Sequence, residues 1–458
     1  MANNKTFLIH FFLFPFFFLV TQGFATAANA ANPEHLEKLR TTQACPKCDL
    51  TDAKLDGENL QEVNLSGAKL NGAQLRGAKL NGANLSSAEL KGAKLTGADL
   101  TGANLKDAKL GIKPLETDAK LPSKLDSPNI VDTLSWFTYF SSVIASWYPE
   151  RVTDLRDAKL QRANLSAADL TGALLTNANL GEAQLSYANL TAAYLEKANL
   201  TNANLAAANL TQANLTQAQL KIATLSAANL TSTQMRGANL DTAKLDNANL
   251  SSADLSQANL NEADLNNSVI QQAKLQDVNL VDANLRSADL SGADLSRANL
   301  KGAGLNRANL TGAKLEGADL TSAKLAIANL TGAQLTGAKL NLAYLHSANL
   351  ANANLNGVDL RQTILRDADL TSATLVGASL ENATLTSAKL TGANLTYSNL
   401  TLCDLTGSNL TGANLSYANL SQANLTLATL VNANLNGANL RDAQIQGTIG
   451  LGSSSSSQ

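Results

Sequence analysis

Leucine recurs at every fifth position along most of this 458-residue chain, and alanine usually stands two positions before each leucine. The spacing runs without a slip from Leu50 to Leu110 and again from Leu155 to Ile445, which makes about 72 units of five residues. The positions between are mostly small and polar, as in TGANLSYANLSQANL at 411–425. The apolar pattern therefore has a period of five, with two apolar positions in each period.

Neither a straight helix nor a straight strand fits this period. In a helix, five residues advance by about 500°, so successive leucines would spiral round every side. In a strand, side chains alternate between faces, so a step of five would move every leucine to the opposite face. An alanine and the leucine two residues later do share one face of a short strand. The pattern therefore predicts a turn of about 90° after each short strand, and four turns close a coil of about 20 residues.

Stacked coils of this kind form a four-sided parallel β-helix, which is an all-β solenoid. Leucine would fill the centre of each layer, and alanine would occupy places where only a methyl group fits. Ladders between coils are about 4.8 Å apart, so roughly 18 coils would make a rod about 85 Å long. A hydrophobic fraction of 45% agrees with two inward residues in every five.

The units GANLS, GADLT and RANLS match the pattern A-(N/D)-L-x-x, and on these residues the chain resembles the pentapeptide-repeat family. The resemblance covers about 360 of the 458 residues. It implies the right-handed, four-sided β-helix of that family. Members often place phenylalanine at the centre of their coils, whereas all ten phenylalanines of this chain lie outside the repeats.

Residues 1–30 are typical of a signal peptide. Lys5 precedes the apolar run FLIHFFLFPFFFLV, and Ala28-Asn29-Ala30 offers small residues for cleavage. The run is shorter than the about 20 residues that a membrane span needs, so no stable span is expected after cleavage. We expect an exported protein of the periplasm, the thylakoid lumen or the extracellular space. An uncleaved N-terminal anchor is the alternative.

Residues 31–48 predict an N-terminal cap for the rod. Asn32 suits an N-cap, Pro33 suits the first helical position, and Leu36 and Leu39 give a short helix one apolar side. Such a helix could cover the apolar cross-section that a β-helix exposes at its end.

Cys45 and Cys48 follow this helix and take inward positions of the first layer. Export commonly means an oxidising compartment, so a structural disulfide is the favoured interpretation. A thioredoxin-like redox role lacks its βαβ context, and a zinc site would want four ligands where only His35 is nearby. Cys403 stands at an alanine position and is expected to be a buried free thiol.

Residues 111–152 break the pattern. The segment contains four prolines and both tryptophans of the chain, and its apolar residues recur at three or four positions as in an amphipathic helix. We expect this helix to pack against the flank of the rod; a docking element for a partner is the alternative. The sequence leaves open whether the segment interrupts the rod or loops out of it. Its packing or docking aromatics would be Trp136, Phe137, Phe140 and Trp147.

The predicted organisation follows from these boundaries. It comprises a signal peptide at 1–30, a cap at 31–48, a first repeat segment at 49–110, an insertion at 111–152, a main repeat segment at 153–447 and a flexible Ser-rich tail at 448–458.

No catalytic, cofactor or metal site is predicted. After removal of the signal peptide only His35 and His346 remain, some 300 positions apart. The many asparagines that precede leucine are expected to form amide ladders between coils. Tyr397 and Tyr417 are 20 apart and should lie in one column, as a local surface pair or, alternatively, a platform for carbohydrate or base stacking.

Charge bears on the class of function. The formal net charge is −2, and loss of Lys5 with the signal peptide makes it −3. No nucleic-acid footprint follows from so neutral a chain. We expect a non-catalytic structural or protein-interaction scaffold, monomeric or weakly associated end to end. The resemblance offers an alternative, a DNA-mimic protein that protects gyrase, but that role would need a strongly negative surface and a cytosolic location.

Overall fold

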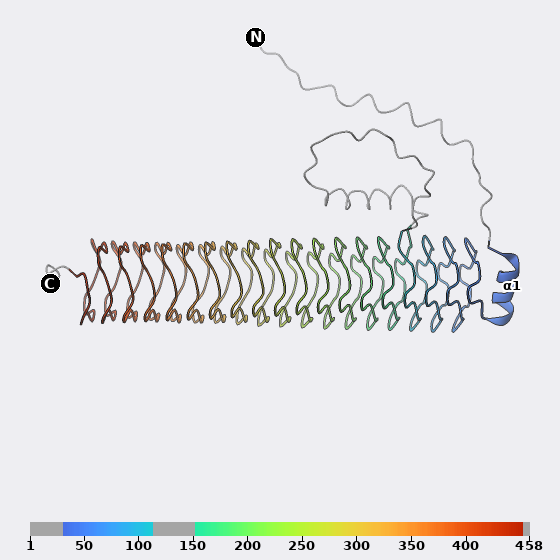
Figure 1. Ribbon diagram of the computed structural model, residues 1–458, viewed down its shortest axis with the longest axis horizontal. Coiled ribbons are helices and arrows are strands. Elements are labelled where there is room, and N and C mark those ends of the chain that lie inside the picture. Colours follow the sequence, from blue (N-terminus) through green and yellow to red (C-terminus); the bar gives the residue numbers. More distant parts are fainter. Residues whose placement is uncertain (1–30, 113–151, 452–458) are drawn as a thin grey trace, which may run out of the picture.

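A computed structural model of the chain describes residues 31–112 and 152–451. The ten-residue helix α1 (Pro33–Thr42) lies at the N-terminal end of a long rod of stacked coils (Figure 1). Each coil takes 20 residues, because parallel bridges join each outward residue to the one 20 positions later, as Lys69 to Glu89. Strands in the described ranges are single isolated bridges, one on each side of a coil. The architecture is therefore the four-sided parallel β-helix that the period of five predicts.

A tight turn forms every corner. At the first one, the Ala53 N–H donates to the Leu50 carbonyl at 3.1 Å, and Asp52 between them has a φ of 56°. A positive φ at the second central residue is the mark of a type II turn, which favours glycine. Most corners nevertheless hold another residue there, at a cost of about 1–2 kcal/mol each. The hydrogen bonds of the coil ladder offset this strain at each corner.

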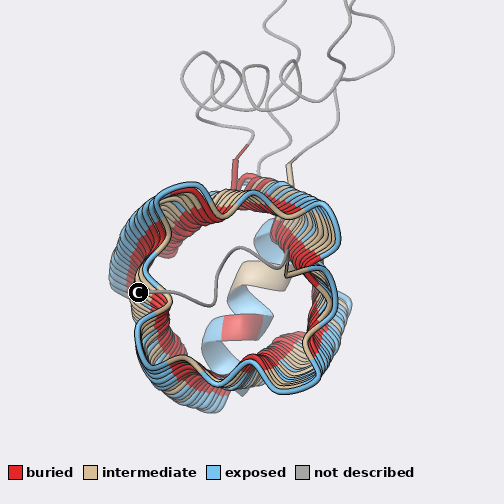
Figure 2. Ribbon diagram, turned by 90° about the vertical axis from the view of Figure 1, so that its left-hand side faces the viewer, coloured by how far each residue is buried: buried red, intermediate tan, exposed pale blue. Residues whose placement is uncertain are grey.

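The core is a single column of leucine and alanine along the inside of the rod (Figure 2). Met235 and Ile270 replace leucine and are equally buried. A few alanine positions hold serine or threonine, whose hydroxyl donates to the carbonyl three residues earlier, as Thr363 does to Leu360 at 2.6 Å. Each such polar group is paired inside the core, which limits the penalty of burying it. Seen from the C-terminal end, α1 lies across the far end of this column (Figure 2).

The rod is continuous through the break in the repeats. Lys94 bridges to Asp154 and Lys109 to Asp169, each 60 positions later in place of 20. The interval is two coils longer than usual, so every later residue keeps its corner and its side. The structure thus decides the question that the sequence left open: the chain leaves the rod after Ile112 and resumes the same coil at Val152. The aromatic residues expected to pack or dock lie in 113–151, outside the described residues.

Two polar residues close the seam where the chain returns. The Thr153 hydroxyl donates to the Leu90 carbonyl at 2.8 Å and accepts the Gly92 N–H at 3.2 Å. The Asp154 carboxylate accepts two bonds from the Arg156 guanidinium, at 2.9 and 2.7 Å. Burial acts to raise the pKa of Asp154, but the bonds from Arg156 outweigh it and hold that pKa below its usual value.

The C-terminal end of the rod lies slightly beyond its expected boundary. The last bridge joins Thr429 to Ile449, whereas the sequence places the end of the repeats at 447. Ile445 and Ile449 are exposed there, in contrast to the buried central residues of earlier coils. The expected signal peptide and most of the Ser-rich tail lie outside the described residues. Within 31–112 and 152–451, no helix has the length and apolar character to cross a membrane.

Candidate interaction surface

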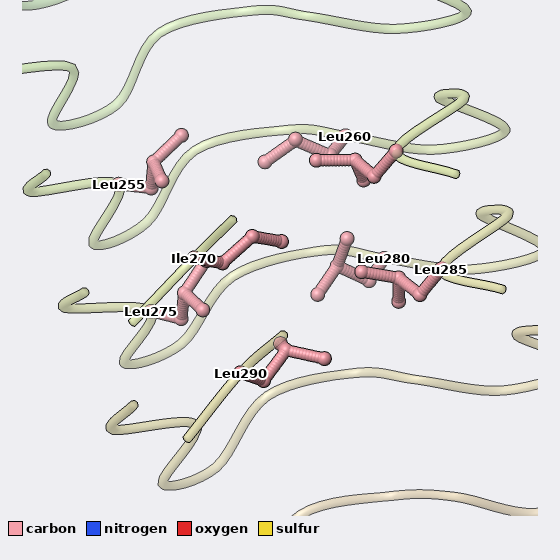
Figure 3. Close-up of a pocket in the computed structure, with 8 residues that line it drawn as sticks. Leu255, Leu260, Ile270, Leu275, Leu280, Leu285 and Leu290 are labelled. Atoms are coloured by element: carbon pink, nitrogen blue, oxygen red, sulfur yellow. The ribbon is translucent and has the colours of Figure 1, made fainter. Parts of the chain in front are cut away.

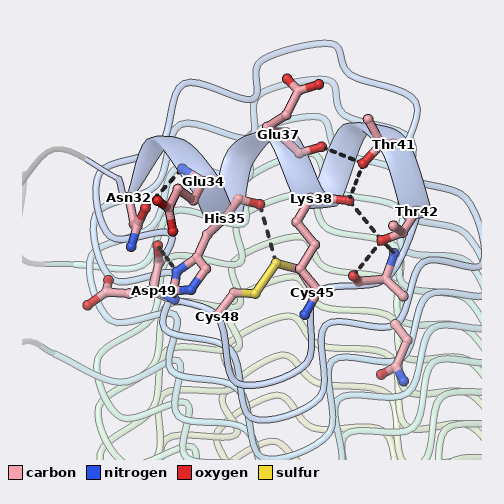
Figure 4. The surroundings of a disulfide bond; sticks show 12 residues. Asn32, Glu34, His35, Glu37, Lys38, Thr41, Thr42, Cys45, Cys48 and Asp49 are labelled. Carbon is pink, nitrogen blue, oxygen red and sulfur yellow. Dashed lines mark hydrogen bonds between the residues drawn. A yellow bond between two sulfur atoms is a disulfide. The ribbon is translucent and has the colours of Figure 1, made fainter.

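Helix α1 closes the N-terminal end of the rod over a disulfide (Figure 4). The Asn32 side chain caps the helix by accepting the Glu34 N–H at 2.9 Å. Cys45 and Cys48, both buried beneath the helix, are joined by a disulfide bond. The Cys45 sulfur lies 3.3 Å from the His35 carbonyl oxygen, a packing contact because a disulfide sulfur carries no proton to donate. The cysteine pair therefore braces the cap and faces no ligand.

His35 also serves the cap. Its Nδ1 accepts the backbone N–H of Asp49 at 3.0 Å, so it satisfies a donor of the first coil that has no preceding coil to bond. The other histidine of the described residues, His346, is exposed on the side of the rod. The two are far apart in the stack, and within the described ranges no three His, Cys, Asp or Glu side chains gather as a metal site would require.

Cys403 takes an alanine position and is fully buried as a free thiol. Burial strongly raises its pKa, and the nearby Asp404 carboxylate adds to the increase. A thiol that stays protonated and out of solvent is a poor nucleophile. Cys403 is therefore a packing residue.

The interior offers no room for a ligand at its most open point (Figure 3). A cavity of about 10 Å³ lies where Ile270 replaces leucine, and its lining is wholly aliphatic. That volume is at the lower limit for one water molecule, and the site has no polar group to hold it. A larger cavity of about 110 Å³ lies beside α1, where Arg40 and Glu58 form an exposed ion pair at 3.7 Å.

Asparagine and threonine side chains connect successive coils along the outside of the rod. The Asn189 side-chain carbonyl accepts the Thr191 backbone N–H and hydroxyl, at 3.2 and 2.6 Å. From the next coil, the Asn209 amide donates to that same hydroxyl at 3.0 Å. Elsewhere amides pair directly, as Asn199 does with Asn179 at 3.1 Å. Direct amide ladders are thus only part of a network in which the carbonyl more often accepts the backbone N–H two residues later.

Large apolar side chains are exposed in one group that neither the core nor the corner geometry accounts for. We call the group of Ile327, Leu342, Tyr344 and Ile364 the apolar face patch; their exposed fractions are 52, 46, 47 and 36%. Tyr344 and Ile364 are bridge partners in adjacent coils. Leu342 stands at one corner of this side, and Ile327 stands at its other corner, bonded through its N–H to the His346 carbonyl at 3.0 Å. The patch therefore spans one side of the rod from corner to corner.

The corner members of the patch are unfavourable twice over. Ile327 has a φ of 61° and Leu342 a φ of 63°, in the left-handed region. A β-branched residue is a rare outlier there, and each residue also exposes apolar surface to water. Sequence reasoning missed this patch; its signal is apolar residues at outward positions of the repeat within a short stretch.

A second exposed group is aromatic. The rings of Tyr397 and Tyr417 stack with centroids 5.1 Å apart and planes inclined by 10°. They occupy the same corner in adjacent coils, as their separation of 20 residues predicts. That corner does not border the side of the rod that carries the apolar face patch.

Comparison with known families gives a consistent result along the rod. The family model described as pentapeptide repeats (8 copies) matches overlapping segments that cover both repeat regions. The matched residues are 47–82, 78–111, 153–191, 188–226, 223–261, 263–302, 288–326, 303–341, 328–367, 363–401 and 403–442. Among curated proteins, none matches the chain.

Several solved structures are similar to parts of the chain. HetL, a pentapeptide repeat protein involved in heterocyst differentiation regulation in the cyanobacterium Nostoc, is 40% identical over 47% of this chain and 90% of its own, with a TM-score of 0.19. A pentapeptide repeat protein from the Arabidopsis thaliana thylakoid lumen is 32% identical over 24% of this chain and 70% of its own, with a TM-score of 0.15. QnrB1, a plasmid-mediated fluoroquinolone resistance protein, is 19% identical over 41% of this chain and 83% of its own, with a TM-score of 0.18.

Proposed function

Because the chain belongs to the pentapeptide-repeat family, whose fold is a right-handed β-helix, we propose that it is a non-catalytic scaffold that binds a protein partner through the apolar face patch. The observation that carries the proposal is that Ile327 and Leu342 are both exposed and held in a strained backbone region. Strain and exposure at one position favour a role outside the fold itself. Tyr344 and Ile364 extend this surface across the side of the rod between them.

Export is the second part of the proposal. It rests on residues 1–30, in which Lys5 precedes a short apolar run and Ala28-Asn29-Ala30 follows. The disulfide of Cys45 and Cys48 fits an oxidising compartment. N-terminal sequencing of the mature protein from each cell fraction tests this part, and a mature chain that still begins at Met1 in the cytosol would contradict it.

The alternative of gyrase protection by DNA mimicry gains no support from the surface. Such a role needs clustered negative charge, whereas acids and bases pair along this rod, as Arg162 with Glu182 and Arg297 with Asp277. The net charge of −2 agrees with that mixture.

The partner surface is tested by quantitative cross-linking in the native compartment. The variant I327N/L342N replaces both strained residues by asparagine, a residue that tolerates a positive φ and occupies the same corners at Asn247 and Asn382. We expect this variant to stay folded and to lose its specific cross-links. The matched control is Ile222→Asn, which changes an exposed isoleucine at a strained corner outside the patch. Equal cross-linking by wild type and I327N/L342N would overturn the proposal.

A further inference from the structure

The stacked tyrosines have one free ring face. Tyr397 and Tyr417 are 63 and 55% exposed, and each occupies the second turn position of its corner, with φ of 60° and 56°. Side chains at this position lean toward the next coil. A Cβ built on Gly437, one coil later at the same corner, would lie 2.6 Å from a ring carbon of Tyr417. The same lean places Leu427 over Gly447 and Gln272 over Gly292.

The lean determines which ring faces are covered. Tyr417 has Tyr397 on one face and the corner of Gly437 on the other. Tyr397 has Tyr417 on one face only, and its opposite face looks along the corner toward Gly377. A Cβ built on Gly377 or on Gly357 would meet no atom within 4 Å. The free face of Tyr397 therefore borders an open shelf of bare glycine backbone.

The surroundings of this shelf are uncharged and rich in amides. From 391 to 440, Asp404 is the sole residue among Lys, Arg, Asp and Glu. Asn394 and Asn399 stand on the two sides that meet at the Tyr397 corner. Their carbonyls accept bonds from the turns that follow, at 2.6 Å from the Thr396 and Thr401 hydroxyls. Within the described residues neither amide nitrogen has an acceptor, so both can donate to a ligand.

We propose that the Tyr397 ring and the Gly377 shelf bind a pyranose unit of a neutral glycan. The apolar C–H groups of a sugar ring can cover an open aromatic face, and its hydroxyls can accept hydrogen bonds from the flanking amides. The other ligands that stack on aromatics fit less well. Nucleic acids need cationic groups for their phosphates, and none stands beside this corner from 391 to 440. The glycan site is separate from the apolar face patch and does not depend on it.

Two substitutions remove the site in different ways. Tyr397→Ala deletes the platform, and alanine already occupies this turn position at Ala207 and Ala227 with a positive φ. Gly377→Gln leaves both tyrosines in place but lays a side chain over the free face of Tyr397, in the way that Gln272 covers Gly292. Because glutamine occupies other corners with positive φ, this variant should fold.

The test titrates the full mature chain with three neutral probes: hexasaccharides of β-1,4-linked N-acetylglucosamine, β-1,4-linked glucose and α-1,4-linked glucose. Binding is followed by saturation-transfer NMR and by tyrosine fluorescence. We expect saturable binding of at least one probe, with affinity lowered about tenfold or more by either substitution. Circular dichroism confirms that each variant is folded.

Two controls match the substitutions. Tyr187→Ala removes a lone tyrosine that is 74% exposed at the same turn position of another corner. Gly412→Gln places glutamine at a glycine corner whose built Cβ meets no atom within 4 Å. Both should bind like the wild type. The proposal is overturned if no probe binds, if all four variants lose binding equally, or if Tyr397→Ala abolishes binding to phosphatidylcholine vesicles while no glycan binds.

Discussion

The Tyr417 ring lies over Gly437, the residue at the same corner one coil later, so closely that a Cβ there would come within 2.6 Å of the ring. The corner therefore accommodates an aromatic side chain because its neighbour has none. Leu427 and Gly447 repeat the relationship at another corner of the rod. Residues 20 apart in this chain thus constrain each other's size.

This relationship predicts the effect of a methyl group at Gly437. Gly437→Ala should be destabilising by about 1–3 kcal/mol from the steric conflict, and the strain of a positive φ adds to it. Gly357→Ala is the matched control, because it has a similar φ of 64° and open space around its Cβ. Denaturant unfolding compares the two variants, and near-ultraviolet circular dichroism reports on the tyrosine stack. If Gly357→Ala is equally destabilising, backbone strain alone is the cause.

The direction of side chains can be tested within a single unit. Ala328 is buried in the core column, whereas Ala326, two residues earlier, stands outside it at a corner. Ala328→Asp should cost about 3 kcal/mol or more, because it buries a carboxylate without a partner. Ala326→Asp should change stability by about 0.5 kcal/mol or less. Thermal unfolding of both variants distinguishes them; similar losses of stability would contradict the inward assignment.

The three thiols should differ in reactivity. In protein purified from the native compartment, alkylation followed by intact-mass measurement should leave Cys45 and Cys48 unmodified until a reductant is added. Cys403 should react only after unfolding, because burial raises its pKa and excludes the reagent. Rapid labelling of all three thiols without reductant would show that the cap is held by α1 alone.

Stability should fall in acid partly through Asp154. Its folded pKa lies below the ordinary value of 3.8, so its stabilising contribution is present above that value and is lost as the pH falls through the folded pKa. Asp154→Asn should be destabilising by about 1–3 kcal/mol at pH 7 and should reduce the difference in unfolding midpoint between pH 7 and pH 3.

Asp359 supplies the control for this prediction. It accepts the same two bonds from Arg361, at 2.9 and 2.7 Å, but its side chain is 25% exposed against 8% for Asp154. Asp359→Asn should therefore have the smaller effect, because solvent weakens an exposed ion pair. Equal effects of the two substitutions would contradict a role for burial at the seam.

The insertion can be removed without disturbing the register. Deletion of 113–152 joins Ile112 to Thr153 and restores a spacing of five between Leu110 and Leu155. We expect the shortened chain to keep the circular dichroism of the rod, because the bridges of Lys94 and Lys109 would then span the usual 20 residues. A chain that fails to fold would contradict this expectation.

The melting temperature of the shortened chain then separates the two interpretations of the aromatic segment. A lower value would show that the segment packs on the rod, as the sequence favours, since each buried apolar side chain contributes about 1.5–3 kcal/mol. An unchanged value with loss of a specific interaction would identify a docking element. An unchanged value with every association retained would make the segment a passive linker.

The repeat alone was enough to predict the architecture of this protein. A period of five with two apolar positions excludes a straight helix and a straight strand, so the turns, the four sides and the inward Ala–Leu pairs follow from local geometry. The cap helix and the column that places Tyr417 after Tyr397 follow from the same register. These features depend only on neighbours along the chain or on the fixed step of 20.

Tertiary structure decided what the register cannot express. The continuity of the rod past Ile112 depends on which strands pair, and a 40-residue excursion leaves no local mark of its destination. The apolar face patch joins Ile327 to Ile364 across coils, and their exposure is a property of the assembled side of the rod. The open ring face of Tyr397 likewise depends on the lean of side chains and on a glycine one coil away. Such contacts are set by packing between coils, which sequence spacing locates but does not orient.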